Sequence, residues 1–203
     1  MLLGVDLLAL AGYAFALCIT PGPNVLMLTA SGAAHGYRAS LPHLLGAAAG
    51  TGLQTWLLAS GLAELFVRHP LLHRALAWVG GAYLLWLGWR LVGAAALHDR
   101  PAGPPLRWRQ ALTLQAVNAK AWMMALATSS LFLPQVGIGA DAPGLAPVLL
   151  GGVMAAVNSA CLSLWALFGS ALRGWMQAPA RRRGFNATMA LLLLVSAWQM
   201  LGL

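Results

Sequence analysis

Long apolar segments separated by short polar interruptions run along the whole chain. Each segment is long enough for a helix across a bilayer, which takes about 20 residues. The segments are apolar on all sides, whereas the strands of a membrane barrel alternate apolar and polar positions over about ten residues. The pattern therefore predicts an all-α membrane protein with six transmembrane helices, over residues 2–34, 41–66, 71–97, 111–134, 145–172 and 184–203.

The composition narrows the class of protein further. Hydrophobic residues make up 60% of the 203 residues and charged residues only 8%, whereas about 25% of the residues in a soluble domain are charged. A soluble surface needs more charge than this chain carries. A soluble enzyme, a DNA-binding domain and a disordered chain are therefore disfavoured. We expect a lipid bilayer and no nucleic acid among the partners, because basic residues have another use in membrane proteins.

The distribution of arginines predicts the orientation in the membrane. Cytoplasmic loops of membrane proteins are enriched in Lys and Arg. One side of the predicted bundle carries only Arg68 and Arg74. The loops after the first, third and fifth segments carry the other arginines: Arg38, Arg90, Arg100, Arg107, Arg109, Arg173, Arg181, Arg182 and Arg183. These loops are predicted to be cytoplasmic, which makes the chain a multi-pass protein of the cytoplasmic (inner) cell membrane with both termini outside.

A polar, proline-rich stretch divides this single transmembrane domain of residues 1–203 into two halves, about residues 1–100 and 106–203. Each half contains three predicted helices, so the halves insert with opposite orientations. Two windows of equal length support the relation, since residues 7–37 carry no formal charge and residues 110–140 carry only Lys120. We therefore interpret the fold as two inverted three-helix repeats, the plan of many secondary transporters.

The first segment contains two prolines near its middle, in the sequence Thr20-Pro21-Gly22-Pro23-Asn24. A continuous helix over residues 2–34 would be about 50 Å long, whereas the hydrocarbon core is only about 30 Å thick. The prolines lack the backbone N–H groups that would bond the carbonyls of Leu17 and Ile19. Inside a membrane such carbonyls must be satisfied by protein, water or a ligand. The motif therefore predicts a discontinuous first helix.

A break of this kind suits both charges of an amino acid. The second half-helix is predicted to begin at Asn24, and its free N–H groups and positive dipole end suit a carboxylate. The freed carbonyls and the Asn24 amide suit an ammonium group or a small cation. The alternative is a kink that only shapes packing, since proline is tolerated in membrane helices.

Lys120 is the only lysine of the chain and lies well inside the fourth segment. An ionisable group there costs at least about 3 kcal/mol on the insertion scale, so a function is expected. Lysine gives up its proton more readily than arginine when desolvated. Lys120 is therefore predicted to carry a coupling proton, with Asp6 or Glu64 as partner, or to bind a substrate carboxylate. Asn118 and Gln115 add polarity nearby; the alternative is a side chain that extends to the cytoplasmic interface.

Two pairs of glycines are spaced four residues apart, Gly32-x-x-x-Gly36 and Gly46-x-x-x-Gly50. This spacing allows two membrane helices to approach closely. We interpret both pairs as packing contacts rather than as part of a binding site.

Several stretches together resemble the LysE/RhtB family of amino-acid exporters, over nearly the whole chain. The Thr20-Pro21-Gly22-Pro23-Asn24 motif is similar to the hallmark of the family's first helix. Asn118-Ala119-Lys120-Ala121 resembles the Asn-Pro-Lys-Ala motif of its fourth helix, but Ala119 replaces the proline, which predicts a weaker second helix break. Further similar stretches are residues 36–40, 46–50, 80–90 and 182–186.

The resemblance implies an exporter that moves small amino acids or related amines outward, by secondary-active antiport against protons. Substrate-binding roles carry over to the residues that match the two motifs: Pro21, Gly22, Pro23, Asn24, Asn118 and Lys120. No catalytic residue, cofactor or resident metal is expected. The sequence is compatible with a homodimer, since small transporters of this kind often pair.

Three other functions would require sequence features different from those of an amino-acid exporter. A metal or other cation exporter of related fold, the main alternative, needs acidic or histidine clusters inside the spans, and the segments contain none. A membrane thiol oxidoreductase needs paired cysteines beside prolines, whereas Cys18 and Cys161 adjoin no proline and are interpreted as inert buried thiols. A scaffold without transport needs neither the break in the first helix nor Lys120.

Overall fold

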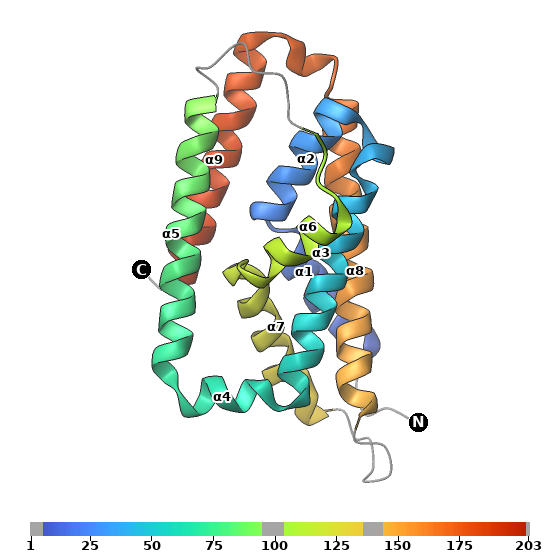
Figure 1. The fold of residues 1–203 in the computed structure, drawn as a ribbon, viewed down its shortest axis with the longest axis vertical. Coiled ribbons are helices and arrows are strands. Elements are labelled where there is room, and N and C mark those ends of the chain that lie inside the picture. Colours follow the sequence, from blue (N-terminus) through green and yellow to red (C-terminus); the bar gives the residue numbers. More distant parts are fainter. Residues whose placement is uncertain (1–5, 95–103, 136–143, 202–203) are drawn as a thin grey trace.

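The computed structural model describes residues 6–94, 104–135 and 144–201, and the regular elements in these ranges are all helices (Figure 1). The all-α prediction is therefore confirmed. The helices are α1 Leu7–Ile19, α2 Pro23–His35, α3 Tyr37–Leu57, α4 Ala63–Arg68, α5 Pro70–Ala94, α6 Trp108–Ala116, α7 Ala119–Phe132, α8 Leu145–Ala171 and α9 Pro179–Leu201. Three short helices, η1 Leu58–Leu62, η2 Leu133–Gln135 and η3 Trp175–Gln177, follow α3, α7 and α8.

The helices follow the six apolar segments of the sequence. Within the described ranges, α8 is long and apolar enough to cross a bilayer, and α1 with α2 meets the same criteria as one bent span. The arrangement of six spans stays a prediction. Asp99, Asp141 and most of the proline-rich stretch, residues 101–103, lie outside the described residues.

The first segment is broken where the sequence predicts. α1 ends at Ile19 and α2 begins at Pro23, and the two axes differ by 67°. Thr20, which precedes a proline, is extended, with φ −65° and ψ 139°, because a following proline disfavours the helical region. Pro23 occupies the first position of α2, where a missing N–H costs no hydrogen bond.

Two glycines with positive φ set the turns of the second segment. Gly36, at φ 87°, is the one residue between α2 and α3, and a Cβ there would meet no neighbour. It serves the turn, so the packing role predicted for this glycine is wrong. Gly61, at φ 120°, bends the chain after α3 into α4, which crosses one end of the molecule to reach α5 (Figure 1). Residues 41–66 therefore do not form one straight helix. Glycine suits the position of the bend, because it adopts a positive φ without strain.

The fourth segment is also broken, although it lacks the motif's proline. α6 ends at Ala116 and α7 begins at Ala119. The intervening Val117 and Asn118 have ψ values of 2° and 92°, outside the helical range. A break therefore forms here without the proline, since a helix can end when other groups take its last carbonyls. That Ala119 makes this break weaker stays a prediction.

The two halves of the chain pack on each other through their helices. α3 lies along α8 on one side of the molecule, and α5 lies along α9 on the other (Figure 1). α1 and α2 contact α8, whereas α6 and α7 contact α3. Each broken helix therefore packs against a long helix from the other half of the chain.

Glycines bring the backbones of these helices into contact. A Cβ on Gly52 of α3 would lie 2.8 Å from the carbonyl oxygen of Gly151 in α8, and a Cβ on Gly151 would lie 2.8 Å from that of Gly52. Gly46 and Gly50 leave no room for a Cβ beside α6. The packing role predicted for the Gly46-x-x-x-Gly50 pair is therefore confirmed.

Many large apolar side chains face outward from this bundle. Leu8, Leu71 and Trp89 are 81%, 78% and 81% exposed. Exposed apolar area on this scale is unfavourable in water and suits the hydrocarbon of a bilayer.

Replacing Gly151 with leucine should force α3 and α8 apart. Its first added carbon would lie 2.8 Å from the carbonyl oxygen of Gly52 and 3.1 Å from Cβ of Trp56. Overpacking of this kind costs about 1–3 kcal/mol. We expect a lower unfolding temperature of the purified protein in detergent, measured by tryptophan fluorescence. Gly152→Leu is the matched control, since a Cβ at Gly152 has no neighbour within 4 Å; equal losses in both variants would contradict this account of the contact.

Candidate functional site

The first helix break is surrounded by side chains that donate hydrogen bonds to its carbonyl groups. The hydroxyl of Thr20 donates to the carbonyl oxygen of Leu17 at 2.7 Å. The indole Nε1 of Trp165 in α8 donates to the carbonyl oxygen of Ile19 at 3.1 Å. The two carbonyls that the prolines deprive of helical partners are therefore both satisfied by side chains.

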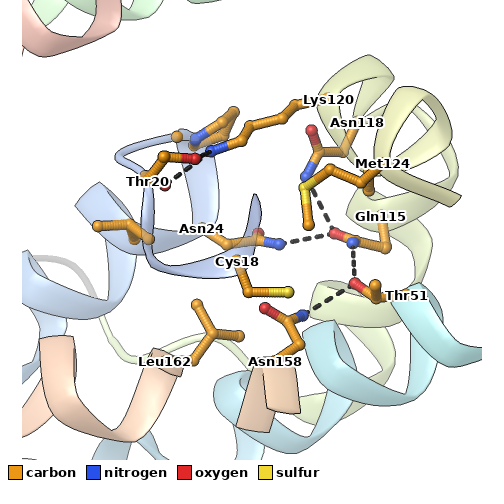
Figure 2. A pocket seen from close by; sticks show the side chains of 14 residues that line it. Cys18, Thr20, Asn24, Thr51, Gln115, Asn118, Lys120, Met124, Asn158 and Leu162 are labelled. Atoms are coloured by element: carbon orange, nitrogen blue, oxygen red, sulfur yellow. Dashed lines mark hydrogen bonds between the residues drawn. The ribbon is translucent and has the colours of Figure 1, made fainter. Parts of the chain in front are cut away.

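Lys120 reaches the same break from α7. Its ammonium Nζ donates to the carbonyl oxygen and the hydroxyl of Thr20 at 2.6 and 2.7 Å, and to the carbonyl oxygen of Pro21 at 3.0 Å. The hydroxyl of Ser196 in α9 also donates to the Pro21 carbonyl, at 3.0 Å. Figure 2 shows the lysine side chain directed at Thr20. The alternative of a side chain extended toward the cytoplasmic interface is therefore wrong.

The second break, between α6 and α7, is capped in a similar way. Gln54 of α3 donates its Nε2 to the carbonyl oxygen of Gln115 at 2.9 Å. Trp122 of α7 donates its Nε1 to the carbonyl oxygen of Ala116, also at 2.9 Å. At each break a tryptophan indole and a polar side chain together occupy carbonyls that the interrupted helix releases.

The side-chain amide of Gln115 connects the two breaks. Its Oε1 accepts hydrogen bonds from Nδ2 of Asn24 at 2.7 Å and from Nδ2 of Asn118 at 3.1 Å. Its Nε2 donates to Oγ1 of Thr51 at 2.7 Å, and Nδ2 of Asn158 donates to the same hydroxyl at 2.9 Å. Figure 2 shows these bonds crossing the middle of the site. The five side chains are all buried, so the network ties α2, α3, α6 and α8 together away from solvent.

Two buried acceptors at this network have no partner within the described residues, Oδ1 of Asn118 and Oε1 of Gln54. Oδ1 of Asn118 is buried and accepts no hydrogen bond within the described part of the chain. A buried polar group without a partner costs about 1–3 kcal/mol. Asn118 lies between Gln115 and Lys120 (Figure 2). Its oxygen is therefore available to a water molecule or to an N–H group of a ligand.

Two cavities share a wall made by Thr20, Lys120 and Met124. The smaller cavity has a volume of about 30 Å³ and lies among the network side chains, where only water fits. The larger cavity has a volume of about 330 Å³, which falls within the range of small-molecule sites. Its other lining residues come from α1, α5, α7 and α9: Leu17, Leu84, Met123, Ala127 and Ser196.

A third cavity, of about 570 Å³, borders α8 and α9 and includes Trp165 and Arg181. Its lining is mainly aromatic and aliphatic, and it reaches the first break only through Ile19. An amino acid needs partners for two charged groups, so the polar wall at Lys120 is the better candidate site.

Comparison with known proteins identifies the family. A family model described as LysE type translocator matches residues 15–202. This chain belongs to the LysE type translocator family. A relative from Salmonella paratyphi A (strain ATCC 9150 / SARB42), named cysteine/O-acetylserine efflux protein, is 35% identical over 125 residues, 61% of this chain and 64% of that protein. That match spans just under two thirds of the Salmonella protein.

A protein of the same name from Escherichia coli (strain K12) is 30% identical over 187 residues, which cover 91% of this chain and 92% of that protein. No solved structure matches the chain. The resemblance to the LysE/RhtB exporters is therefore confirmed, and the protein is a translocator rather than an enzyme.

The structure of this LysE type translocator brings together the residues that its two motifs single out. Gly22, Pro23, Asn24, Asn118 and Lys120 all line the small cavity. Pro21 takes part through its carbonyl oxygen, which accepts from Lys120. Whether these six residues bind substrate stays a prediction.

Other residues of the site were missed by sequence reasoning. Thr51, Asn158 and Ser196 are polar residues inside apolar segments, and that polarity was the available signal. Trp165 is a different case: a tryptophan inside a span is equally compatible with a cavity wall and with ordinary packing, and the sequence did not decide between them. All four contact the breaks or their network only through tertiary packing.

The two acidic residues suggested as proton-relay partners of Lys120 lie elsewhere in the translocator. Asp6 caps the first turn of α1 and accepts from the backbone N–H groups of Leu8 and Ala9. Glu64 pairs with Arg68 at 2.6 Å on an exposed face. Neither carboxylate contacts Lys120, so this pairing is wrong in the structure.

Both cysteines of the translocator are free and buried. Cys18 and Cys161 belong to one apolar cluster with Met124 and Met154. The interpretation as buried thiols is confirmed. Cys18 also lines the small cavity, which the sequence did not predict.

Replacing Gln115 with methionine should destabilise the translocator. The change keeps the length of the side chain but leaves Nδ2 of Asn24 and of Asn118 without their acceptor. Each unpaired buried donor costs about 1–3 kcal/mol. We expect a clear drop in the unfolding temperature in detergent. Gln135→Met, at an exposed glutamine, is the control and should unfold like the parent; an unchanged Gln115→Met protein would contradict the role of the network.

Proposed function

We propose that this translocator exports small amino acids or related amines across the cytoplasmic membrane. The observation that carries the proposal is the contact of the Lys120 ammonium with three oxygens of a broken helix, in the wall of a cavity of about 330 Å³. The names of the relatives support it, since they describe efflux of cysteine and O-acetylserine. Both compounds are small amino acids, which fits a cavity at the low end of the range for small-molecule sites.

The polar groups at the break suit the two ends of an amino acid. The carbonyls of Thr20 and Pro21 point at a cation, as their contact with Lys120 illustrates. Gly22, Pro23 and Asn24 form the start of α2, whose free N–H groups and positive dipole end suit a carboxylate. We assign the substrate-binding role to these residues together with Asn118 and Lys120.

Substrate must change the shape of the site in order to reach the start of α2. The small cavity beside the N-terminus of α2 has room only for water, whereas the large cavity lies across the wall that contains Lys120. Substrate therefore occupies the large cavity first, and movement of Lys120 opens the wall between the cavities. This order agrees with the alternating access of secondary transporters.

We propose that the six predicted spans form two inverted repeats, the plan of many secondary transporters. Each broken helix packs on a long helix of the other half, and each break is capped by a tryptophan. This correspondence supports a pseudo-symmetric pair of halves, with the substrate between the two breaks.

Proton antiport is the proposed energy source. Lys120 is the charged side chain common to the two cavities at the break, and a lysine in this position can release its proton to a passing water or to the medium. The alternative cargo, a metal ion, has less support: the described residues contain no group of three or more His, Cys, Asp or Glu side chains that could hold one.

Replacing Lys120 with alanine should reduce amino-acid efflux to background. The change removes the charged group that we propose binds the substrate carboxylate, and a hydrogen bond to a charged group is worth about 1.5–3 kcal/mol, so a loss of about 10- to 100-fold in rate is expected. Efflux of labelled cysteine, O-acetylserine, serine and lysine is measured from vesicles with and without a proton gradient. Pro21→Ala is expected to lose efflux as well.

Ser130→Ala, an exposed position on the same helix as Lys120, is the control and should transport like the parent. Full efflux by Lys120→Ala protein that is present in the membrane would rule out the proposed role of the lysine. Absence of efflux of every amino acid by the parent would favour a cation as the cargo.

The arginine distribution makes a separate prediction about orientation. Alkaline phosphatase fused after Leu203 should be active, and green fluorescent protein at the same position should be dark, because the cytoplasmic side is assigned to the arginine-rich loops. A fluorescent and phosphatase-negative pair of fusions would reverse the orientation and leave the site unaffected.

A further inference from the structure

The oxygens at the first break match the donors of one primary ammonium group. Nζ of Lys120 has three N–H donors and no acceptor. Its three bonds, of 2.6, 2.7 and 3.0 Å, go to the carbonyl and hydroxyl of Thr20 and to the carbonyl of Pro21. The same hydroxyl donates to Leu17, so the arrangement of acceptors is itself held by the end of α1. We call these three oxygens the ammonium seat.

No carboxylate belongs to this seat in the described ranges. Asp6 is occupied at the start of α1, and Glu64 pairs with Arg68. The positive charge is therefore held by neutral oxygens alone. The seat has no chemical feature that selects a lysine over the ammonium group of another molecule.

The stem of Lys120 fits because residue 22 is glycine. A Cβ on Gly22 would lie 2.8 Å from Cδ and 3.1 Å from Nζ of Lys120. Gly22 is extended, with φ −166°, a conformation open to any residue. The contact is therefore steric: a side chain at residue 22 would have to displace the lysine from its position across the break.

We propose that Lys120 is a tethered occupant of the ammonium seat, which the primary ammonium group of the substrate displaces. This inference rests on the proposed function, since it assigns a role to the same site during transport. In the empty translocator Lys120 satisfies the carbonyls of the break. With substrate bound, the substrate ammonium takes these oxygens, and the released lysine pairs with the substrate carboxylate.

The physical advantage is that the break is satisfied in both states. Carbonyls without hydrogen-bond donors are unfavourable in a membrane, so an empty seat would hinder the return of the unloaded protein. Exchange of one ammonium for another keeps the number of hydrogen bonds constant. It also moves the side chain that separates the two cavities, so arrival of substrate and opening of the wall become one event.

The test uses purified full-length protein in detergent and amines that lack a carboxylate. Lys120→Met keeps an apolar stem but removes the tethered ammonium. Propylammonium binding is measured by calorimetry and by the shift in unfolding temperature, with tetramethylammonium as the control cation without N–H donors. Labelled amino-acid efflux by the parent is measured in parallel.

Propylammonium should bind Lys120→Met at least about 10-fold more tightly than the parent, in which the seat is occupied. Adding Thr20→Val to Lys120→Met removes one of the three acceptors and should weaken propylammonium binding by about 10-fold or more. Tetramethylammonium should show no preference among the variants. Equal propylammonium affinity in parent and Lys120→Met, or an equal preference for tetramethylammonium, would overturn the inference.

Gly22→Ala provides a second test that keeps the lysine. Its Cβ pushes against Cδ of Lys120, so the tether should leave the seat and propylammonium binding should rise above that of the parent. Unchanged binding in a folded Gly22→Ala protein would count against displacement.

The experiment can overturn the ammonium seat and the proposed export function independently of each other. If propylammonium binds Lys120→Met but the parent exports no amino acid, the ammonium seat is supported and the proposed export function is overturned. If the parent exports amino acids but propylammonium does not bind Lys120→Met, the ammonium seat is overturned and the proposed export function is unaffected.

Discussion

Carbonyl groups released inside an apolar bundle need donors, and this requirement organises the structure around its two helix breaks. Pro21 and Pro23 interrupt the first helix, and the released carbonyls accept hydrogen bonds from Thr20, which follows α1, and from side chains of α7, α8 and α9. The second break draws its donors from α3 and α7. Several helices must therefore come together at each break. The small and the large cavity lie where these helices meet.

Glycines make this convergence possible. Gly50 of α3 lies against the side chain of Gln115, and the next residue, Thr51, accepts a hydrogen bond from the same glutamine. On α8, Gly169 lies against the backbone of Thr29 in α2, one turn beyond Trp165, which donates to the first break. Close backbone contacts and polar contacts thus alternate along the same helices. The close packing at the glycines therefore positions the side chains that donate hydrogen bonds at the breaks.

The described part of the site consists of neutral dipoles and one charged side chain. The side chains that link the breaks are amides and hydroxyls, which share hydrogen bonds without a fixed ion pair. Among the described residues, Lys120 is the one that brings a charge to the break, and neutral oxygens hold it. A zwitterion can exchange with such a charge without separating a buried ion pair, which is costly in an apolar interior.

The sequence by itself determined the features that depend on local chemistry. Apolar segments predict helices because their length and hydropathy are properties of the segment, and prolines predict the first break because they lack an N–H. The presence of a break at Ala119, without proline, and the bend at Gly61 depended on neighbouring elements. The donors depended on them as well: Asn24 and Gln115 lie 91 residues apart, and Ser196 lies 175 residues from Pro21. Such partners meet only when the helices pack, because hydrogen bonds between side chains require an approach of about 3 Å that no local pattern encodes.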